Sequence, residues 1–337
     1  MTFYVLGACV ALATFGAVSL AVSGALLIVW PLAKSRLDAV APRPRGGWLL
    51  ALRLAPNMLG ALASASVALP SFLEFEPRDT AEEAGAILLM LAVSGLAVAA
   101  LAVVRGIRSS RRTGRVIREW SRTAVPVALG GVDLPAFHIE SALPIVALAG
   151  WRRPGLFLAG SVVDRCGRRL LLAMAAHEEG HRRSADNLKR FLLAVCADPL
   201  LACRAGREMV AAWEAAAEEA ADDEAIASGA RPTDLAAALV SVARLAPAVS
   251  WPALPGAAFC RDGSLDRRVR RMLEARPGPA PFAPRRRVRS AVGVLLLAAG
   301  WILAAESLHR PLHRLLEHAV TGPHTDLRAL VVGHRRA

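Results

Sequence analysis

Apolar residues form three long runs in the first third of the chain, with polar segments between them. The runs are Thr2–Leu32, Trp48–Leu73 and Gly85–Val104. Each is long enough to supply the ~20 residues that a helix needs to cross the hydrocarbon core of a bilayer. Arg53 and Pro56 interrupt the second run. Basic residues follow the first run rather than precede it, so this run favours a transmembrane helix over a cleavable signal peptide.

A fourth and shorter apolar run, Ala291–Leu308, comes after a polar stretch of about 180 residues, and the basic segment PRRRVRS precedes it. The pattern predicts a three-helix transmembrane region over residues 1–105, a polar domain over 106–287, a fourth transmembrane helix over 288–308 and a short tail over 309–337.

The polar domain has the pattern of a mostly helical α+β fold. Short apolar segments predict three strands, at His138–Glu140, Pro144–Gly150 and Gly155–Ala159. Longer segments predict four helices, at Arg168–Asp186, Arg204–Ser228, Pro232–Leu245 and Ser264–Ala275. The apolar segment Phe191–Cys203 is too short to span a bilayer. We interpret it as a buried helix or as a helix that rests on the membrane.

The composition agrees with this division. Hydrophobic residues make up 55% of the 337 residues and charged residues 20%, and the mean hydropathy is +0.41. An ordinary soluble enzyme is less apolar than this, so the charges must be concentrated outside the spans. The five cysteines form no CxxC pair and are odd in number, which excludes a disulfide framework. We interpret them as packing residues of a domain in a reducing compartment.

The net charge of +13 comes mainly from arginine clusters at Arg43–Arg45, Arg105–Arg118 and Arg285–Arg289, each beside an apolar run. Such clusters mark the cytoplasmic ends of transmembrane helices, where the lipid surface is anionic. All three fit one topology in a multi-pass cell-membrane protein, with the polar domain in the cytoplasm and both termini outside. No aromatic residues alternate with the basic ones, so we expect no direct binding of nucleic acid.

The segment His177-Glu178-Glu179-Gly180-His181 carries the clearest chemistry. Two histidines four residues apart lie on one face of a helix and can share a tetrahedral zinc ion. Glu178 can then act as general base toward a water molecule that the zinc acidifies. The pattern is typical of zinc metallopeptidases, and it is rare by chance in a chain with eight histidines.

A catalytic zinc normally takes a third protein ligand. The metzincin type is excluded, because its Gly and His would stand at the positions of Ser184 and Asn187. The other common ligand is a glutamate on a later helix, and the acidic segment WEAAAEEAADDEAIA offers two equally spaced choices. The first is Glu218, with Asp222 four residues on to orient a ligand histidine. The second is Glu219 with Asp223, and an acidic helix face can also be merely solvated.

Four segments together resemble the M56 peptidase family of membrane-bound zinc peptidases, and more distantly the M48 family. They are PIVALAGWRRPGLFLAG, HEEGHRRSADNL, EEAADDEA and SLDRRVRRML, and the resemblance covers about residues 125–275. EEAADDEA is similar to the family pattern E-x-x-A-D, which aligns Glu218, Ala221 and Asp222. The resemblance implies a zincin-like domain of the gluzincin type facing the cytoplasm, with Glu218 as third ligand. It does not extend to the extracellular penicillin-binding domain of the family's β-lactam sensors.

Five of the eight histidines fall in the tail, at His309, His313, His318, His324 and His334. Leucines at helical spacing beside them predict an amphipathic surface segment or a disordered end. His309 and His313, four residues apart, are a weaker candidate pair for metal binding or pH sensing. His138 stands among strand-forming residues, where a structural role is expected.

These features together predict an integral-membrane zinc endopeptidase. We expect its substrate to be a cytoplasmic or membrane-adjacent protein or peptide, in a signalling role by family analogy. The alternative is a peptidase-like signalling or scaffold protein without turnover, but the intact set of His177, Glu178 and His181 argues against it. A metal-responsive sensor that uses the tail histidines is a third possibility.

Overall fold

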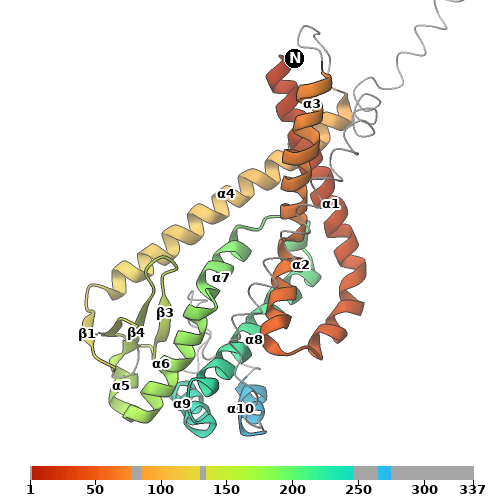
Figure 1. Cartoon of the computed structure of the whole chain (residues 1–337). Helices are drawn as coiled ribbons and strands as arrows, with labels where there is room; N and C mark the ends of the chain where they lie inside the picture. The colour runs from red at the N-terminus through yellow and green to blue at the C-terminus, as the bar shows by residue number, and fades with distance from the viewer. Residues whose placement is uncertain (1, 77–84, 130–133, 246–264, 275–337) are drawn as a thin grey trace, which may run out of the picture.

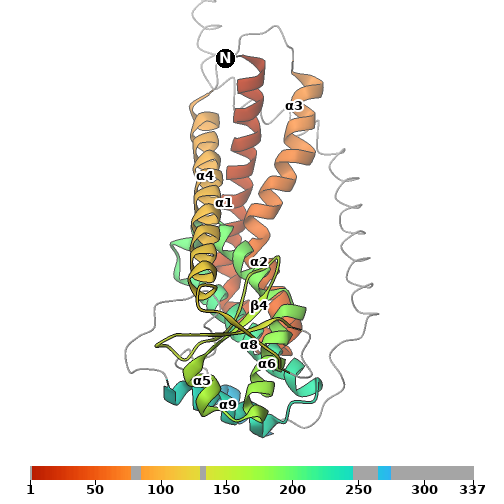
Figure 2. The same ribbon diagram turned by 90° about the vertical axis from the view of Figure 1, so that its left-hand side faces the viewer.

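The computed structural model describes residues 2–76, 85–129, 134–245 and 265–274. Within these residues the protein is mostly helical, with one small sheet. The long N-terminal helices form a bundle, and the sheet lies with the shorter helices at the end of this bundle away from the N-terminus (Figures 1 and 2). The expected fourth transmembrane helix at 288–308 and the tail at 309–337 lie outside the described residues.

Three long helical segments correspond to the three apolar runs. They are α1 (Phe3–Asp38), the continuous segment Pro42–Phe75 and α4 (Ala86–Trp120), and each is long and apolar enough to cross a membrane. The middle segment consists of α2 (Pro42–Ala63), the π-helical turn η1 (Ser64–Ala68) and α3 (Leu69–Phe75).

Glycines let α1 and α4 approach each other closely. A Cβ atom on Gly95 of α4 would lie 2.1 Å from the carbonyl oxygen of Leu12, and one on Gly16 of α1 would lie 2.7 Å from Ser94 Oγ. Small residues at such crossings are typical of helix pairs in membranes, where close packing replaces the hydrophobic driving force.

The helices extend beyond the apolar runs. The loop expected over Lys34–Gly47 is wrong in extent, because α1 continues to Asp38 and α2 already begins at Pro42. Proline is tolerated in the first turn of a helix and arginine is a good helix former, so APRPRGG can begin a helix. For the same reason α4 continues through residue 105 and the arginine-rich segment to Trp120.

The sheet has four short strands in the order β1-β2-β4-β3. They are β1 (Val125–Val127), β2 (Ala136–Ile139), β3 (Val146–Ala149) and β4 (Gly155–Ala159). β2 and β4 are parallel and the other two pairs are antiparallel. Three strands were predicted, and β1 was missed because it is exposed and contains Pro126. In this strand order β3 lies at one edge of the sheet, and all its residues are buried.

The shorter helices follow the sheet along the chain. They are α5 (Gly160–Arg165), α6 (Arg168–Arg183), α7 (Asp186–Val195), the 3-10 turn η2 (Pro199–Leu201), α8 (Arg204–Ala227), α9 (Pro232–Leu245) and α10 (Leu265–Glu274). Residues of β2, β3, β4, α6 and α9 share one hydrophobic core. A second core joins α8 to α1 and α2.

Two helix predictions in this region need correction. The helix expected over Arg168–Asp186 breaks at Ala185, whose φ of 54° is left-handed, and α7 begins at Asp186. The separate helix expected over Phe191–Cys203 is wrong. α7 ends at Val195 and an extended residue, Asp198, precedes Pro199, because proline disfavours helical backbone in the residue before it.

Candidate metal centre

The two motif histidines lie side by side on α6, and both are buried. Their ring centroids are 4.8 Å apart, with the rings nearly perpendicular. Gly180 between them lies where α6 crosses α8, and a Cβ atom there would come 3.1 Å from the Cα of Ala221. The glycine of the motif, to which the sequence analysis gave no role, therefore allows α8 to approach the histidine face of α6.

That approach brings Glu218 of α8 against both imidazoles. Its Oε2 lies 3.4 Å from His177 Nε2, and its Oε1 lies 3.3 Å from His181 Nε2. The ligand atoms of these three buried residues lie within 4.8 Å of one another, so they could hold a metal ion. Within the described part of the chain, they are the group of histidine, cysteine and acidic residues that meets this condition.

Glu219, the alternative to Glu218, faces away from the histidines. Its carboxylate pairs with Arg45 of α2, and its Oε1 lies 2.8 Å from Arg267 of α10. Adjacent positions on a helix point about 100° apart, so Glu218 and Glu219 cannot both face α6. The structure therefore brings Glu218, and not Glu219, to the histidines.

The outer nitrogen of each imidazole meets an aspartate. His177 Nδ1 lies 2.9 Å from Asp222 Oδ1, as the spacing from Glu218 predicted. His181 Nδ1 lies 2.8 Å from Asp186 Oδ2, a partner for which the sequence analysis gave no role. The helix break at Ala185 turns α7 so that its first residue reaches back to α6. Carboxylates in these places fix each ring so that Nε2 is the nitrogen presented to a metal.

Arg268 of α10 holds this arrangement from the outside. Its Nε and Nη2 each lie 2.8 Å from an oxygen of Asp222, and its Nη1 lies 3.2 Å from Glu218 Oε2. The two bonds to Asp222 make this pair bidentate. The Arg268 side chain is 2% exposed, so the pair is also shielded from water. The sequence offered only an arginine-rich helix as a signal, and it did not indicate which arginine points inward.

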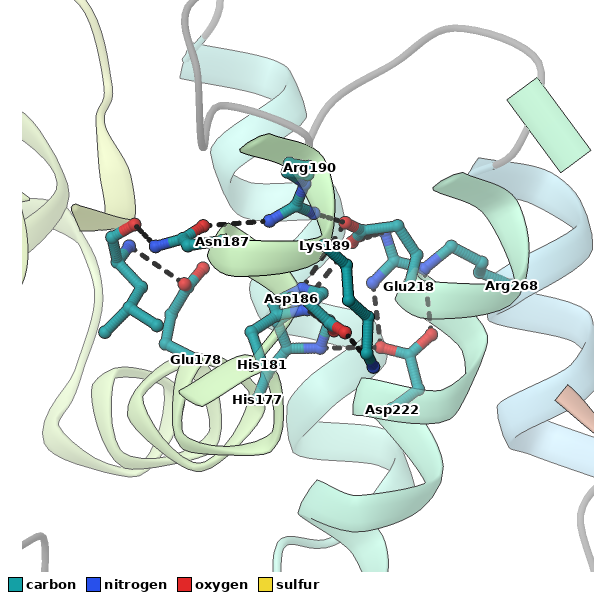
Figure 3. A network of polar contacts seen from close by, with 11 residues as sticks. His177, Glu178, His181, Asp186, Asn187, Lys189, Arg190, Glu218, Asp222 and Arg268 are labelled. Carbon is teal, nitrogen blue, oxygen red and sulfur yellow. Dashed lines mark hydrogen bonds and ion pairs between the residues drawn. The ribbon is translucent and has the colours of Figure 1, made fainter. Parts of the chain in front are cut away.

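Glu178, the predicted general base, is buried beside the edge strand. The backbone N–H of Leu148 donates to Glu178 Oε2 at 2.9 Å. Asn187 of α7 donates to the carbonyl oxygens of Leu148 and Gly150, both at 2.9 Å. Glu178 of α6 and Asn187 of α7, which lie on the same side of the centre in Figure 3, are thus both joined to β3. The outward backbone groups of Leu148 are thus satisfied by side chains of the centre.

The surroundings shift the pKa values of the buried acids in different directions. Burial raises the pKa of Glu178. Burial also acts to raise the pKa of Glu218, but the charge of His181 and the bonds to both histidines outweigh it and hold that pKa well below its ordinary value. The pKa of Asp222 is lowered in the same way by Arg268 against the effect of burial. Glu218 and Asp222 are therefore carboxylates, the form that binds cations.

The other candidate residues lie elsewhere. His138 packs against Gly160, where a Cβ atom would come 2.9 Å from its Nε2, and it contributes no ligand to the group above. Cys9, Cys166, Cys196 and Cys203 are free thiols, while Cys260 and the five tail histidines lie outside the described residues.

No protein-family model, curated protein or solved structure matches the chain. The interpretation of the centre therefore rests on its own residues.

Proposed function

We propose that this protein is an integral-membrane zinc endopeptidase. The observation that carries the proposal is the convergence of His177 Nε2 and His181 Nε2 on the carboxylate of Glu218, with Glu178 beside them. Two imidazole nitrogens and one carboxylate oxygen are a common ligand set for a catalytic zinc, which keeps one position open. The carboxylates on both outer nitrogens add the support that such histidine ligands normally have.

Each residue then has a distinct task. His177, His181 and Glu218 hold the ion, Asp222 and Asp186 orient the imidazoles, and Glu178 handles the proton. Bound zinc supplies Lewis-acid chemistry that polarises a peptide carbonyl and acidifies a water molecule. This agrees with a zincin-like domain of the gluzincin type and with the resemblance to the M56 family.

Glu178 moves one proton through the reaction. It accepts a proton from water as the water oxygen bonds to the carbonyl carbon of the peptide. It then gives this proton to the nitrogen of the leaving amine as the C–N bond breaks, and it returns to the ionised state. One water is consumed for each bond cut. The Leu148 N–H fixes the carboxylate that makes both transfers.

We infer that the peptidase domain lies in the cytoplasm and cuts a cytoplasmic or membrane-adjacent protein. The α1–α2 connection and the arginine-rich end of α4 both lie on the same side of the bundle as the sheet, as the distribution of positive charge favours (Figures 1 and 2). The resemblance to the M56 family supports a role in signalling.

The test uses the full-length protein in detergent, with zinc stoichiometry and cleavage measured together. Wild-type protein should contain one zinc per chain and cut itself or fluorescent casein. Glu178→Gln should keep the zinc and lose at least about 100-fold in cleavage, because it removes the proton acceptor. His181→Ala should lose both.

Glu179→Gln is the matched control, because Glu179 is the next residue and pairs with Arg182 and Arg183 outside the centre. It should behave as wild type. Wild-type protein without zinc, or full cleavage by Glu178→Gln, would refute the proposal and favour a non-catalytic signalling or scaffold protein.

A further inference from the structure

Resting on the proposed endopeptidase function, we propose that Arg190 binds the carbonyl oxygen of the scissile peptide bond as that oxygen becomes an oxyanion. Peptide hydrolysis places negative charge on this oxygen, and fixed donors aimed at it are among the strongest contributions to catalysis. The residues assigned so far hold a metal, orient its ligands or carry a proton. Arg190 has none of these tasks, although it lies at the centre.

Arg190 reaches the centre from the second turn of α7 (Asp186–Val195). Its Nη2 lies 3.2 Å from Glu218 Oε1, the same oxygen that lies 3.3 Å from His181 Nε2. Its Nη1 lies 3.2 Å from Asn187 Oδ1. Figure 3 shows the guanidinium group between the side chains of Asn187 and Glu218. Its donors are therefore one contact away from the atoms that converge to hold a metal.

The other two cations of the centre are already committed. Arg268 makes two 2.8 Å bonds to Asp222 and is 2% exposed. Lys189 lies 2.8 Å from Asp186 Oδ1. Both contacts of Arg190 are 3.2 Å long, at the weak end of the range for N–H···O bonds, and its side chain is 20% exposed. Lys189 is more exposed, at 32%, but it is held by its 2.8 Å ion pair with Asp186, so Arg190 is the cation of these three that is both partly exposed and held only by long contacts.

If Arg190 turns toward a substrate, Glu218 and Asn187 each keep other contacts. Glu218 would keep its contacts with Arg268 and with both histidines. Asn187 would keep its two bonds to the edge strand, which use its amide nitrogen rather than Oδ1. The movement exchanges two 3.2 Å hydrogen bonds, one to Glu218 Oε1 and one to Asn187 Oδ1, for hydrogen bonds to the substrate oxygen.

The surroundings limit that movement to a small range. The guanidinium carbon lies 5.9 Å from the ring centroid of Trp213, within reach of a cation–π contact. Asn187 is itself fixed by β3, the strand whose Leu148 N–H holds Glu178. The base and the proposed oxyanion donor are thus tied to the same strand. Arg190 would donate hydrogen bonds without transferring a proton, since arginine stays charged.

The experiment compares wild-type protein with Arg190→Ala and Arg190→Lys, as full-length chains loaded with zinc in detergent. The first readout is the Kd of a phosphinic peptide, whose tetrahedral anion imitates the oxyanion. The second is zinc stoichiometry, and the third is kcat and KM for casein. Arg190→Ala should keep one zinc per chain, bind the phosphinic peptide about 100-fold more weakly and lose about 100-fold in kcat with little change in KM. Arg190→Lys should recover part of both losses.

Arg182→Ala is the matched control, because Arg182 lies on α6, is 41% exposed and pairs with Glu179 outside the centre. It should leave the Kd of the phosphinic peptide unchanged. Loss of zinc from both Arg190 variants would overturn the proposal, because Arg190 would then serve only to hold Glu218. An unchanged Kd in Arg190→Ala with zinc retained would also overturn it. Either result leaves the endopeptidase proposal standing, whereas wild-type protein without zinc would remove both.

Discussion

Two groups of buried charged residues, among those that the structure describes, differ in their balance of charge. At the foot of the helical bundle, Arg53 of α2 pairs with Asp198 between α7 and α8, one cation with one anion. Cys196 Sγ lies 3.2 Å from both Arg53 Nη1 and Asp198 Oδ2. At the candidate metal centre, four carboxylates face three cations and two imidazoles. The carboxylates are Glu178, Asp186, Glu218 and Asp222, the cations are Lys189, Arg190 and Arg268, and the imidazoles are His177 and His181.

Burial of charge does not by itself make a site that could hold a cation. The Arg53 pair neutralises itself and joins two parts of the fold. Its thiol is inert as well, because burial raises the pKa of Cys196 to about 12. The candidate metal centre instead has an excess of negative charge, and two imidazole nitrogens converge there on one carboxylate, so it could hold a divalent cation.

Breaking the Arg53 pair should give the largest effect on stability. Asp198→Ala leaves a buried guanidinium without its carboxylate, which should lower the free energy of unfolding by about 3–5 kcal/mol. Denaturant unfolding of the full-length protein in detergent measures this. Zinc content of the folded fraction should be unchanged. If the free energy of unfolding fell by less than about 1 kcal/mol, Arg53 would have found another partner. The Arg53 pair would then not be the structural ion pair that the comparison assumes.

Breaking one support of the metal centre should have a smaller effect, and mainly on zinc. Asp222→Asn removes the negative charge beside His177 Nδ1, so zinc affinity should fall about 10- to 100-fold. Competition with a chromophoric chelator measures it. Asp223→Asn is the matched control, because Asp223 pairs with Arg271 and is 37% exposed. Equal zinc affinities in the two variants would contradict the assignment of Asp222.

The smallest effect should come from an ion pair near the surface. Arg43 of α2 lies 3.3 Å from Glu224 of α8 and is 36% exposed, while Glu224 keeps a second partner in Arg183 at 3.0 Å. Arg43→Ala should therefore change the free energy of unfolding by about 1 kcal/mol or less and leave zinc binding as it is. The same unfolding assay applies. If Arg43→Ala lowered the free energy of unfolding as much as Asp198→Ala does, the exposure of an ion pair would not determine how much it stabilises this protein.

Local pattern was enough to predict much of the fold and the main residues of the centre. The three long apolar runs gave three long helices, and helical spacing placed His177 with His181 and Glu218 with Asp222. Spacing works for these residues because each pair belongs to one helix, where positions four apart share a face. The choice of Glu218 over Glu219 came from the family resemblance, and Glu218 is the one of the two whose carboxylate lies beside both histidines.

Contacts between elements could not be read from the sequence. Arg268 is 46 residues from Asp222, and Arg190 is 28 residues from Glu218. Nothing near Ala185 predicts a left-handed residue, so the turn that brings Asp186 to His181 was missed. The loop expected at Lys34–Gly47 was too long for a related reason, because the first turn of α2 also contacts α8 through the ion pairs of Arg43 with Glu224 and of Arg45 with Glu219.

The basic segment between α1 and α2 has a consequence for the order of synthesis. Arg45 and Arg43 pair with Glu219 and Glu224, which follow them by 174 and 181 residues. On the proposed topology, anionic lipid headgroups are the available counter-ions for these arginines until α8 leaves the ribosome. The same arginines then exchange lipid for protein when the cytoplasmic domain folds. On that topology, the arginines that orient the new chain in the membrane also form the surface on which α8 docks.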